Sequence, residues 1–122
     1  MKHLVTATLF LVGVIHLLPI AGVLGNDALG KLYGVTIDEP NLSILMRHRA
    51  VLFGILGLYF WAAAVLVPLQ VAAFFMGFAS VLGFMLLAWL TGGCNPQISR
   101  VIAVDWVALA LLSLGAICKW HT

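Results

Sequence analysis

The chain has 122 residues, of which 64% are hydrophobic and only 8% are charged, and its formal net charge at pH 7 is +2. Its mean hydropathy is +1.18. In a typical soluble domain, about a quarter of the residues are charged. This chain therefore has too few polar groups to cover its surface in water, and its composition predicts a protein of the lipid bilayer. The small net charge, without a basic patch that contains interleaved aromatic residues, argues against a nucleic-acid partner.

Four apolar runs follow one another along the chain, at about residues 4–24, 44–67, 69–90 and 101–118. Each approaches the ~20 residues that a helix needs to cross ~30 Å of hydrocarbon. Backbone groups in lipid must find hydrogen-bond partners within their own segment, so we expect each run to be a helix. The sequence thus predicts an all-α fold, in which residues 1–122 form a single domain with four transmembrane helices in up-down order.

The expected connections differ in length. Pro68 lacks an N–H group and suits the first position of a helix, so the second and third helices should form a hairpin with almost no loop. Residues 91–99, TGGCNPQIS, have the composition of a turn. The long connection covers residues 25–43, and connections of this length tend to be functional lids or disordered.

Polar side chains gather where the end of the first helix, the start of the second, the end of the third and the start of the fourth meet at one membrane face. The fourth helix and the long connection add acidic groups to the basic ones at this end. The candidate ligand-binding residues are His16, Arg47, His48, Arg49, Arg100 and Asp105, with Asp38, Glu39 and Asn41 as candidate contributions from the long connection. These residues match no known catalytic motif, and they predict no metal site.

Asp105 is the most demanding of these residues, because it lies about 6 to 8 Å inside the expected start of its helix at 1.5 Å per residue. A lone charge at the centre of a membrane helix costs about 2.5 to 3.5 kcal/mol. We therefore expect its carboxyl group to face inward and either to find a cation, with Arg47 or Arg49 as the favoured partner, or to be protonated. Those two arginines are about 200° apart around their helix, so only one can point fully inward.

Several roles for this polar end remain open. The arginines can serve only as anchors to lipid phosphates, with one Asp–Arg pair that fixes the helix register. The same groups can bind a ligand, or pair with a neighbouring membrane subunit. A quinone or another amphiphile would suit an apolar body with a basic rim. A b-type haem needs two facing axial ligands, and His16 and His48 are the only pair of histidines on this face.

Small residues recur at four-residue spacing, in the pairs Ala73 with Gly77 and Ala79 with Gly83. Such pairs let helix backbones approach closely in lipid. They indicate either packing inside the bundle or a face for self-association, so the partners expected are the bilayer itself and either a second copy or a larger membrane complex.

Residues 32–64, LYGVTIDEPNLSILMRHRAVLFGILGLYFWAAA, resemble the DoxX-like group of small four-helix membrane proteins. The similarity lies in the chain length, in the long first connection, and in a basic residue that opens the second helix before a glycine-containing run. That group includes quinone-linked oxidoreductase subunits and assembly helpers. The resemblance carries over no set of catalytic residues.

The sequence thus favours a small, non-enzymatic membrane protein, either an accessory subunit or a binder of a lipid-like ligand at the polar end. The alternative is a quinone- or haem-linked membrane redox component. We expect a bacterial inner-membrane location. The count of Lys and Arg favours a cytoplasmic polar end, but the two ends become equal if Arg47 and Arg49 serve the interior.

Overall fold

The computed structural model describes residues 2–121, and all regular structure in that range is helical. Four segments, Lys2–Leu24, Pro40–Val65, Val67–Thr91 and Pro96–Trp120, are long and apolar enough to cross a membrane. The expected all-α bundle of four membrane helices is therefore confirmed. The elements in chain order are α1 (Lys2–Leu17), the 3-10 helix η1 (Leu18–Leu24), α2 (Asn26–Tyr33), α3 (Pro40–Val65), the 3-10 helix η2 (Val67–Leu69), α4 (Gln70–Thr91) and α5 (Pro96–Trp120).

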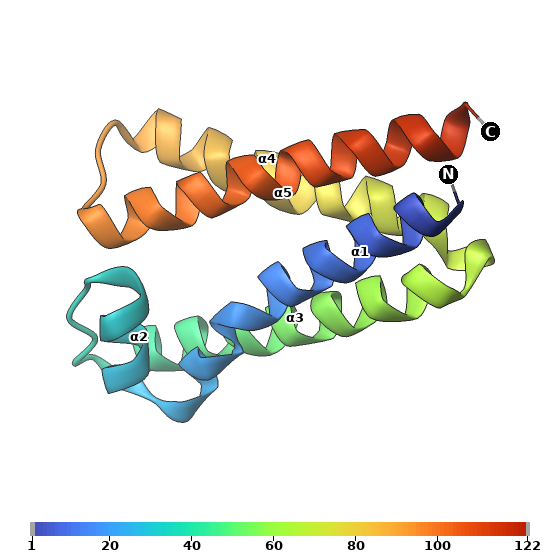
Figure 1. The fold of residues 1–122 in the computed structure, drawn as a ribbon. Helices are drawn as coiled ribbons and strands as arrows, with labels where there is room; N and C mark the ends of the chain where they lie inside the picture. Colours follow the sequence, from blue (N-terminus) through green and yellow to red (C-terminus); the bar gives the residue numbers. More distant parts are fainter. Residues whose placement is uncertain (1, 122) are drawn as a thin grey trace.

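The bundle consists of two antiparallel pairs, α1 with α3 and α4 with α5 (Figure 1). α1 also packs along α5, which joins the two pairs. The pairs converge at the end that holds both chain termini and spread apart at the other end, where α2 lies between them (Figure 1). This spreading creates room for a pocket beside α2.

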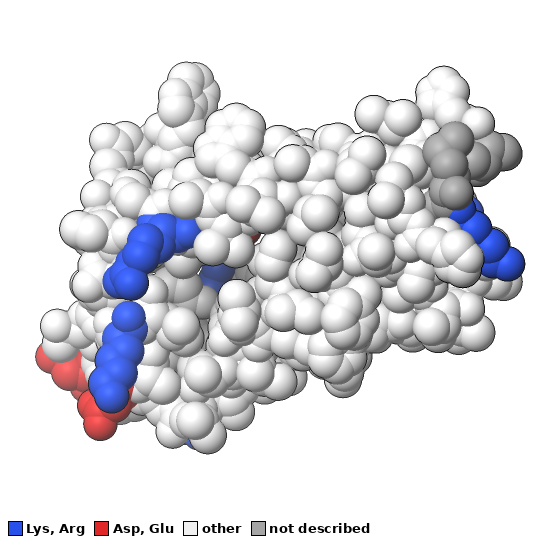
Figure 2. Space-filling model, viewed as in Figure 1, with Lys and Arg blue, Asp and Glu red and all other residues white. Residues whose placement is uncertain are grey.

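The core runs along the bundle axis and is built from large apolar side chains of all four long helices. Leu9, Phe60, Phe74 and Leu112, one from each, are fully buried. Apolar side chains also cover the outside, and Figure 2 shows uncharged residues over the middle of the bundle with charged ones gathered toward its ends. An outer surface of this kind is stable in lipid and not in water.

α1 and α3 cross where two glycines meet. A Cβ atom on Gly13 would lie 3.0 Å from the carbonyl oxygen of Gly57, and one on Gly57 would lie 3.0 Å from that of Gly13. Only glycine lets the two backbones come this close. On α4, Ala73 and Gly77 are buried and pack inside the bundle, whereas Ala79 is exposed and a Cβ on Gly83 would meet nothing within 4 Å.

Two helices begin earlier than expected, because their caps extend them into polar sequence. α3 begins at Pro40 rather than residue 44, and the Glu39 carboxylate accepts hydrogen bonds from the backbone N–H groups of Asn41 (3.0 Å) and Leu42 (2.9 Å). α5 begins at Pro96 rather than residue 101, and the Asn95 side chain accepts a bond from the N–H of Ile98 (2.8 Å). Side chains that satisfy the first N–H groups stabilise a helix start.

The long connection, for which the sequence left a functional lid or a disordered segment open, is a folded cap that contains α2. Its helix α2 packs against η1, α3 and α5 around a small core of Leu29, Tyr33 and Ile37. The Asn95 amide group donates to the carbonyl oxygens of Tyr33 (2.7 Å) and Gly34 (3.0 Å). Asn95 therefore caps α5 and fastens the end of α2 to it at the same time.

Candidate functional site

A pocket of about 240 Å³ lies where the two helix pairs spread apart, between α1 with η1, α2, α3 and α5. Most of its wall is apolar, and it includes Leu18, Phe53 and Val104. The polar side chains His16, Tyr33 and Asp105 also line it, with Lys31, Gln97 and Arg100.

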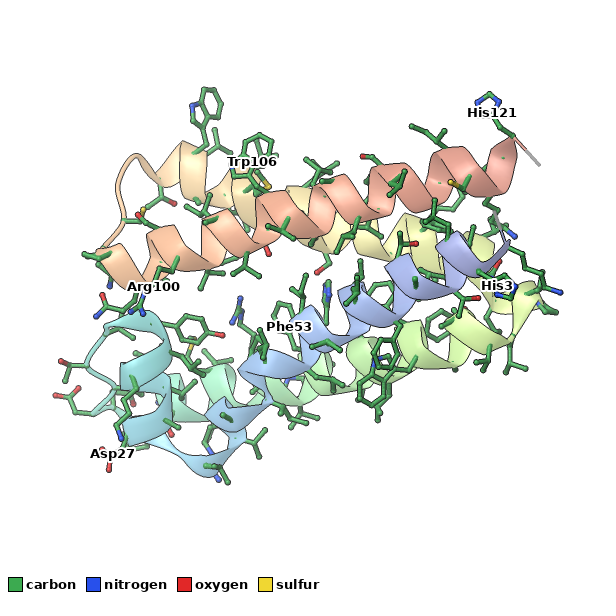
Figure 3. All side chains as sticks on the ribbon, in the orientation of Figure 1. His3, Asp27, Phe53, Arg100, Trp106 and His121 are labelled. Carbon is green, nitrogen blue, oxygen red and sulfur yellow. The ribbon has the colours of Figure 1, made fainter. Side chains whose placement is uncertain are left out.

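The pocket opens on the side of the bundle. Figure 2 views the molecule across the helix axes and shows the hollow on this side face, with basic side chains beside it and inside it. Figure 3 shows Arg100 in the space between the start of α5 and α2. In a bilayer, this side of the bundle would face lipid rather than the water beyond the helix ends.

Arg49 lies behind the pocket wall and is held by aromatic residues. Its Nη1 donates a hydrogen bond to the Tyr33 hydroxyl oxygen (2.6 Å). The guanidinium carbon lies 4.5 Å from the ring centre of Phe53, 5.1 Å from that of Tyr33 and 5.8 Å from that of Phe84. Each of these contacts is a cation–π interaction, which is stronger where water is excluded.

Asp105 faces inward, as expected, but it makes no direct pair with an arginine. Its half-buried carboxyl group lines the pocket, and Arg49 is the charged residue that interacts with it electrostatically. Within residues 2–121 no Lys, Arg or His nitrogen lies within 4.0 Å of the carboxylate, and no hydrogen bond reaches it. The expected contact between Asp105 and a guanidinium is therefore wrong, although the two groups belong to the same site.

Arg49 and Asp105 are each the tenth residue of their own helix. At 1.5 Å per residue this is about 13 Å from the start of the helix, which is deeper for Asp105 than the expected 6 to 8 Å. The difference follows from the early start of α5 at Pro96.

Arg47 and His48 lie outside the pocket. Arg47 is exposed, and its Nε donates to the carbonyl oxygen of Val23 (3.0 Å). Only one of the two arginines points inward, as the helix geometry requires, and it is Arg49. His48 is exposed and hydrogen-bonds to no other residue in the part of the chain described.

His16 is almost completely buried, with 3% of its surface exposed. Its Nδ1 lies 2.9 Å from the Val12 carbonyl oxygen, which can only accept, so Nδ1 carries the proton. In the neutral ring Nε2 then accepts from the Ser80 hydroxyl (3.0 Å). This bond links α1 to α4. Because both ring nitrogens are engaged and His48 points outward, the two histidines do not form the facing pair that a b-type haem needs.

The three candidates from the long connection do not reach the pocket. Glu39 is the cap of α3, and its two backbone hydrogen bonds lower the pKa of its carboxyl group. Asp38 and Asn41 are exposed. The connection contributes Lys31 and Tyr33 of α2 instead.

Sequence reasoning missed several residues of the site. Phe53 lies four positions after Arg49, on the same face of α3, so helical spacing could have identified it. Tyr33 and Lys31 gave no signal, because the sequence was not expected to form a helix there. The sequence did not indicate Ser80 either, because its hydrogen bond to His16 depends on how α4 is rotated about its axis.

The arrangement combines an apolar, partly aromatic wall, a basic rim and a carboxyl group that makes no hydrogen bond or direct ion pair within the described residues. Such a pocket can hold an apolar body by burial and a polar group by hydrogen bonds or charge. Comparisons of the chain with protein-family models, with curated proteins and with solved structures find no match. The interpretation of the site therefore rests on its geometry.

Proposed function

We propose that this protein is a small, non-enzymatic membrane protein that takes an amphiphilic ligand from the bilayer into the pocket between α1, α2, α3 and α5. The observation that carries the proposal is the pocket on the side of the bundle, at a carboxyl group that makes no hydrogen bond or direct ion pair with residues 2–121. A pocket of about 240 Å³ is larger than the 150 Å³ cavity that accommodates benzene. The ligand part it encloses is therefore a substituted ring or a short branched chain.

The polar groups of the pocket lie at different depths, and this difference would fix the orientation of a bound ligand. Asp105 lies five residues deeper in α5 than Arg100, about 7 to 8 Å at 1.5 Å per residue. A hydroxyl or amine group on the enclosed part would donate to Asp105. An anionic or carbonyl group nearer the surface would meet Arg100 and Lys31, which line the pocket.

The proposal includes a bacterial inner-membrane location, membership of the DoxX-like group and a role as an accessory subunit of a larger complex. The four-helix topology and the long first connection support these parts of the proposal. The folded cap formed by α2 adds support, because it offers a structured surface to a partner at the membrane face.

A quinone-linked redox component is the second candidate. The aromatic side chains Phe53 and Tyr33 favour it, because they can stack on a quinone ring. Asp105 would then accept a hydrogen bond from the hydroxyl group of the reduced ring. The haem form of this alternative is not proposed again, because His16 and His48 do not face one another.

The test uses a substitution that fills the pocket and a matched one that does not. Val104 lines the pocket, whereas Val107 is exposed on the same helix and is not part of the lining. The wild type, Val104→Trp and Val107→Trp would be purified in mild detergent, and their organic extracts compared by mass spectrometry.

We expect one amphiphile at near-stoichiometric amount in the wild type and in Val107→Trp, and at least a tenfold lower amount in Val104→Trp. A compound with reversible redox absorbance would select the quinone candidate, and a co-purifying membrane protein would support the accessory-subunit role. Equal amounts in all three proteins, or no compound in the wild type, would contradict ligand binding in this pocket.

A further inference from the structure

A second feature lies on the outer face of the bundle, where η1 crosses α3. Ile20, Val23 and Leu24 of η1 and Val51 and Ile55 of α3 line an almost wholly apolar groove. A polar hollow adjoins it and shares Leu24 with it. The polar side chains of that hollow are Asn26, Asp27, Lys31, Ser43 and Arg47.

The register of α3 aligns the two parts. Arg47, Val51, Ile55 and Leu58 are spaced by four, four and three residues, so they follow one another along one helix face. Arg47 precedes the end of α3 at Val65 by 18 residues, which is about 27 Å at 1.5 Å per residue. This length is close to the ~30 Å of the hydrocarbon core. Arg47 therefore sits at the level of the lipid headgroups, and the apolar groove descends below it.

The guanidinium of Arg47 is held in place by one hydrogen bond, and its other donors remain available to a ligand. Its Nε donates to the Val23 carbonyl oxygen (3.0 Å), which holds the group over the groove. Its two terminal amino groups donate to no residue between 2 and 121. A planar pair of donors fits two oxygens of a phosphate group. Lys31 adds a second positive charge to the same hollow.

Asp27 is the acidic residue of the hollow and is exposed on α2 (Figure 3). Its carboxylate can only accept hydrogen bonds. Ser43 and Asn26 are already bonded to one another, since the Ser43 hydroxyl donates to the Asn26 side-chain oxygen (2.6 Å). A lipid headgroup in this hollow can thus place its phosphate against Arg47 and Lys31. A hydrogen-bond donor on the same headgroup can bind the Asp27 carboxylate.

We propose that the groove binds a phospholipid of the surrounding bilayer whose headgroup donates hydrogen bonds. The phosphate lies against Arg47, the headgroup donor against Asp27, and one acyl chain along Val51 and Ile55. Phosphatidylglycerol has hydroxyl donors and phosphatidylethanolamine an ammonium donor, whereas the choline headgroup has none. The site is separate from the ligand pocket, with which it shares only Lys31.

The test is a titration of the purified protein in detergent with each of these three lipids, followed by native mass spectrometry. Phosphatidylglycerol and phosphatidylethanolamine should bind the wild type at least fivefold more tightly than phosphatidylcholine. Arg47→Gln should weaken phosphatidylglycerol binding by about tenfold. The matched control Lys2→Gln, which removes one positive charge at the opposite end of the bundle, should stay within twofold of the wild type.

Asp27→Ala removes the acceptor and tests the headgroup preference independently; it should narrow the gap between phosphatidylglycerol and phosphatidylcholine to less than twofold. If the circular dichroism spectrum of Arg47→Gln shows less helix than the wild type, the Asp27 variant alone tests the proposal. Equal losses in Arg47→Gln and Lys2→Gln, or no preference among the three lipids in the wild type, would overturn the proposal. Displacement of the lipid by an equal concentration of inorganic phosphate would reduce the site to a simple anion site and would overturn it as well.

Discussion

Arg49 shows how a cation inside the helix bundle is stabilised without a direct ion pair among residues 2–121. Its guanidinium contacts the Tyr33 hydroxyl and the rings of Tyr33, Phe53 and Phe84. A hydrogen bond from a charged donor contributes about 1.5 to 3 kcal/mol, and a desolvated cation–π contact can add about 2 kcal/mol. These contacts compete with Asp105 for the guanidinium, and they leave the carboxyl group accessible from the pocket.

Double-mutant cycles should separate these partners of Arg49. The cycle of Arg49→Met with Tyr33→Phe should give a coupling free energy of about 1 to 2 kcal/mol, because the two side chains share a direct hydrogen bond. The cycle of Arg49→Met with Asp105→Asn should give a smaller coupling free energy, because these two side chains share no direct hydrogen bond. The free energy of unfolding in mixed micelles provides the measurement. A larger coupling with Asp105 than with Tyr33 would contradict this description.

At the scale of the elements, the crossing of α1 and α3 depends on backbone proximity. In Gly57→Ala the new Cβ would meet the Gly13 carbonyl oxygen at 3.0 Å and Cγ of Leu17 at 2.7 Å. The carbonyl cannot move without shifting α1, so the free energy of unfolding should fall by about 1 to 3 kcal/mol.

Gly83→Ala is the matched control on α4, because its Cβ would meet nothing within 4 Å. Alanine is also the better helix former, so this variant should be as stable as the wild type or more stable by up to about 1 kcal/mol. Equal destabilisation by both substitutions would show that the close approach of α1 and α3 is not what the glycine provides.

The start of α3 should respond to pH through Glu39. The hydrogen bonds from the N–H groups of Asn41 and Leu42 stabilise the carboxylate and lower its pKa. The capping contribution is therefore complete above the unfolded-state pKa of about 4.3, and it is lost as the pH falls through the lower folded-state value.

Thermal unfolding between pH 6 and pH 3 should show this loss in the wild type as a falling melting temperature. Glu39→Gln should flatten that part of the profile, because the amide oxygen accepts hydrogen bonds at every pH. Asp38→Asn removes the adjacent carboxylate, which accepts no hydrogen bond within residues 2–121, and should keep the shape of the wild-type curve. An unchanged acidic slope in Glu39→Gln would argue against the cap.

At the scale of the whole molecule, four helices in up-down order return the chain to the side where it began, and Figure 1 shows the two termini at the same end. Reporter domains fused to either terminus should therefore report the same compartment. Phosphatase and fluorescent-protein fusions provide the measurement, with a fusion inserted after Gly93 in the α4–α5 turn as the control for the opposite side. Opposite compartments for the two termini would exclude the four-span topology.

The fold was predictable because the bilayer requires apolar helices of a certain length. This requirement can be read from the composition and from the apolar runs without knowing how the helices pack. The site was predictable only in part. His16, Arg100 and Asp105 line one pocket, and Arg49 lies behind its wall. Arg47 and His48 flank Arg49 in the sequence, but they face outward.

What separates these neighbours is the rotation of α3 about its axis. The apolar run around them is nearly uniform, so it gave no basis for choosing the inward face. The role of Tyr33 required α2, an eight-residue helix of mixed polarity whose stability comes from packing and from Asn95. Short helices of this kind owe little to local propensity, so the sequence carries little sign of them.

If the pocket takes its ligand from the bilayer, as proposed, that ligand arrives already dissolved among the acyl chains. The occupancy of the pocket then depends on the mole fraction of ligand in the lipid phase. The concentration of ligand in water matters only because it sets how much ligand partitions into the lipid. Doubling the amount of lipid or detergent at a constant amount of ligand and protein should halve the fraction of ligand per lipid and shift the midpoint of a titration accordingly. Under this proposal a weak intrinsic affinity is sufficient, because the membrane itself would concentrate the ligand.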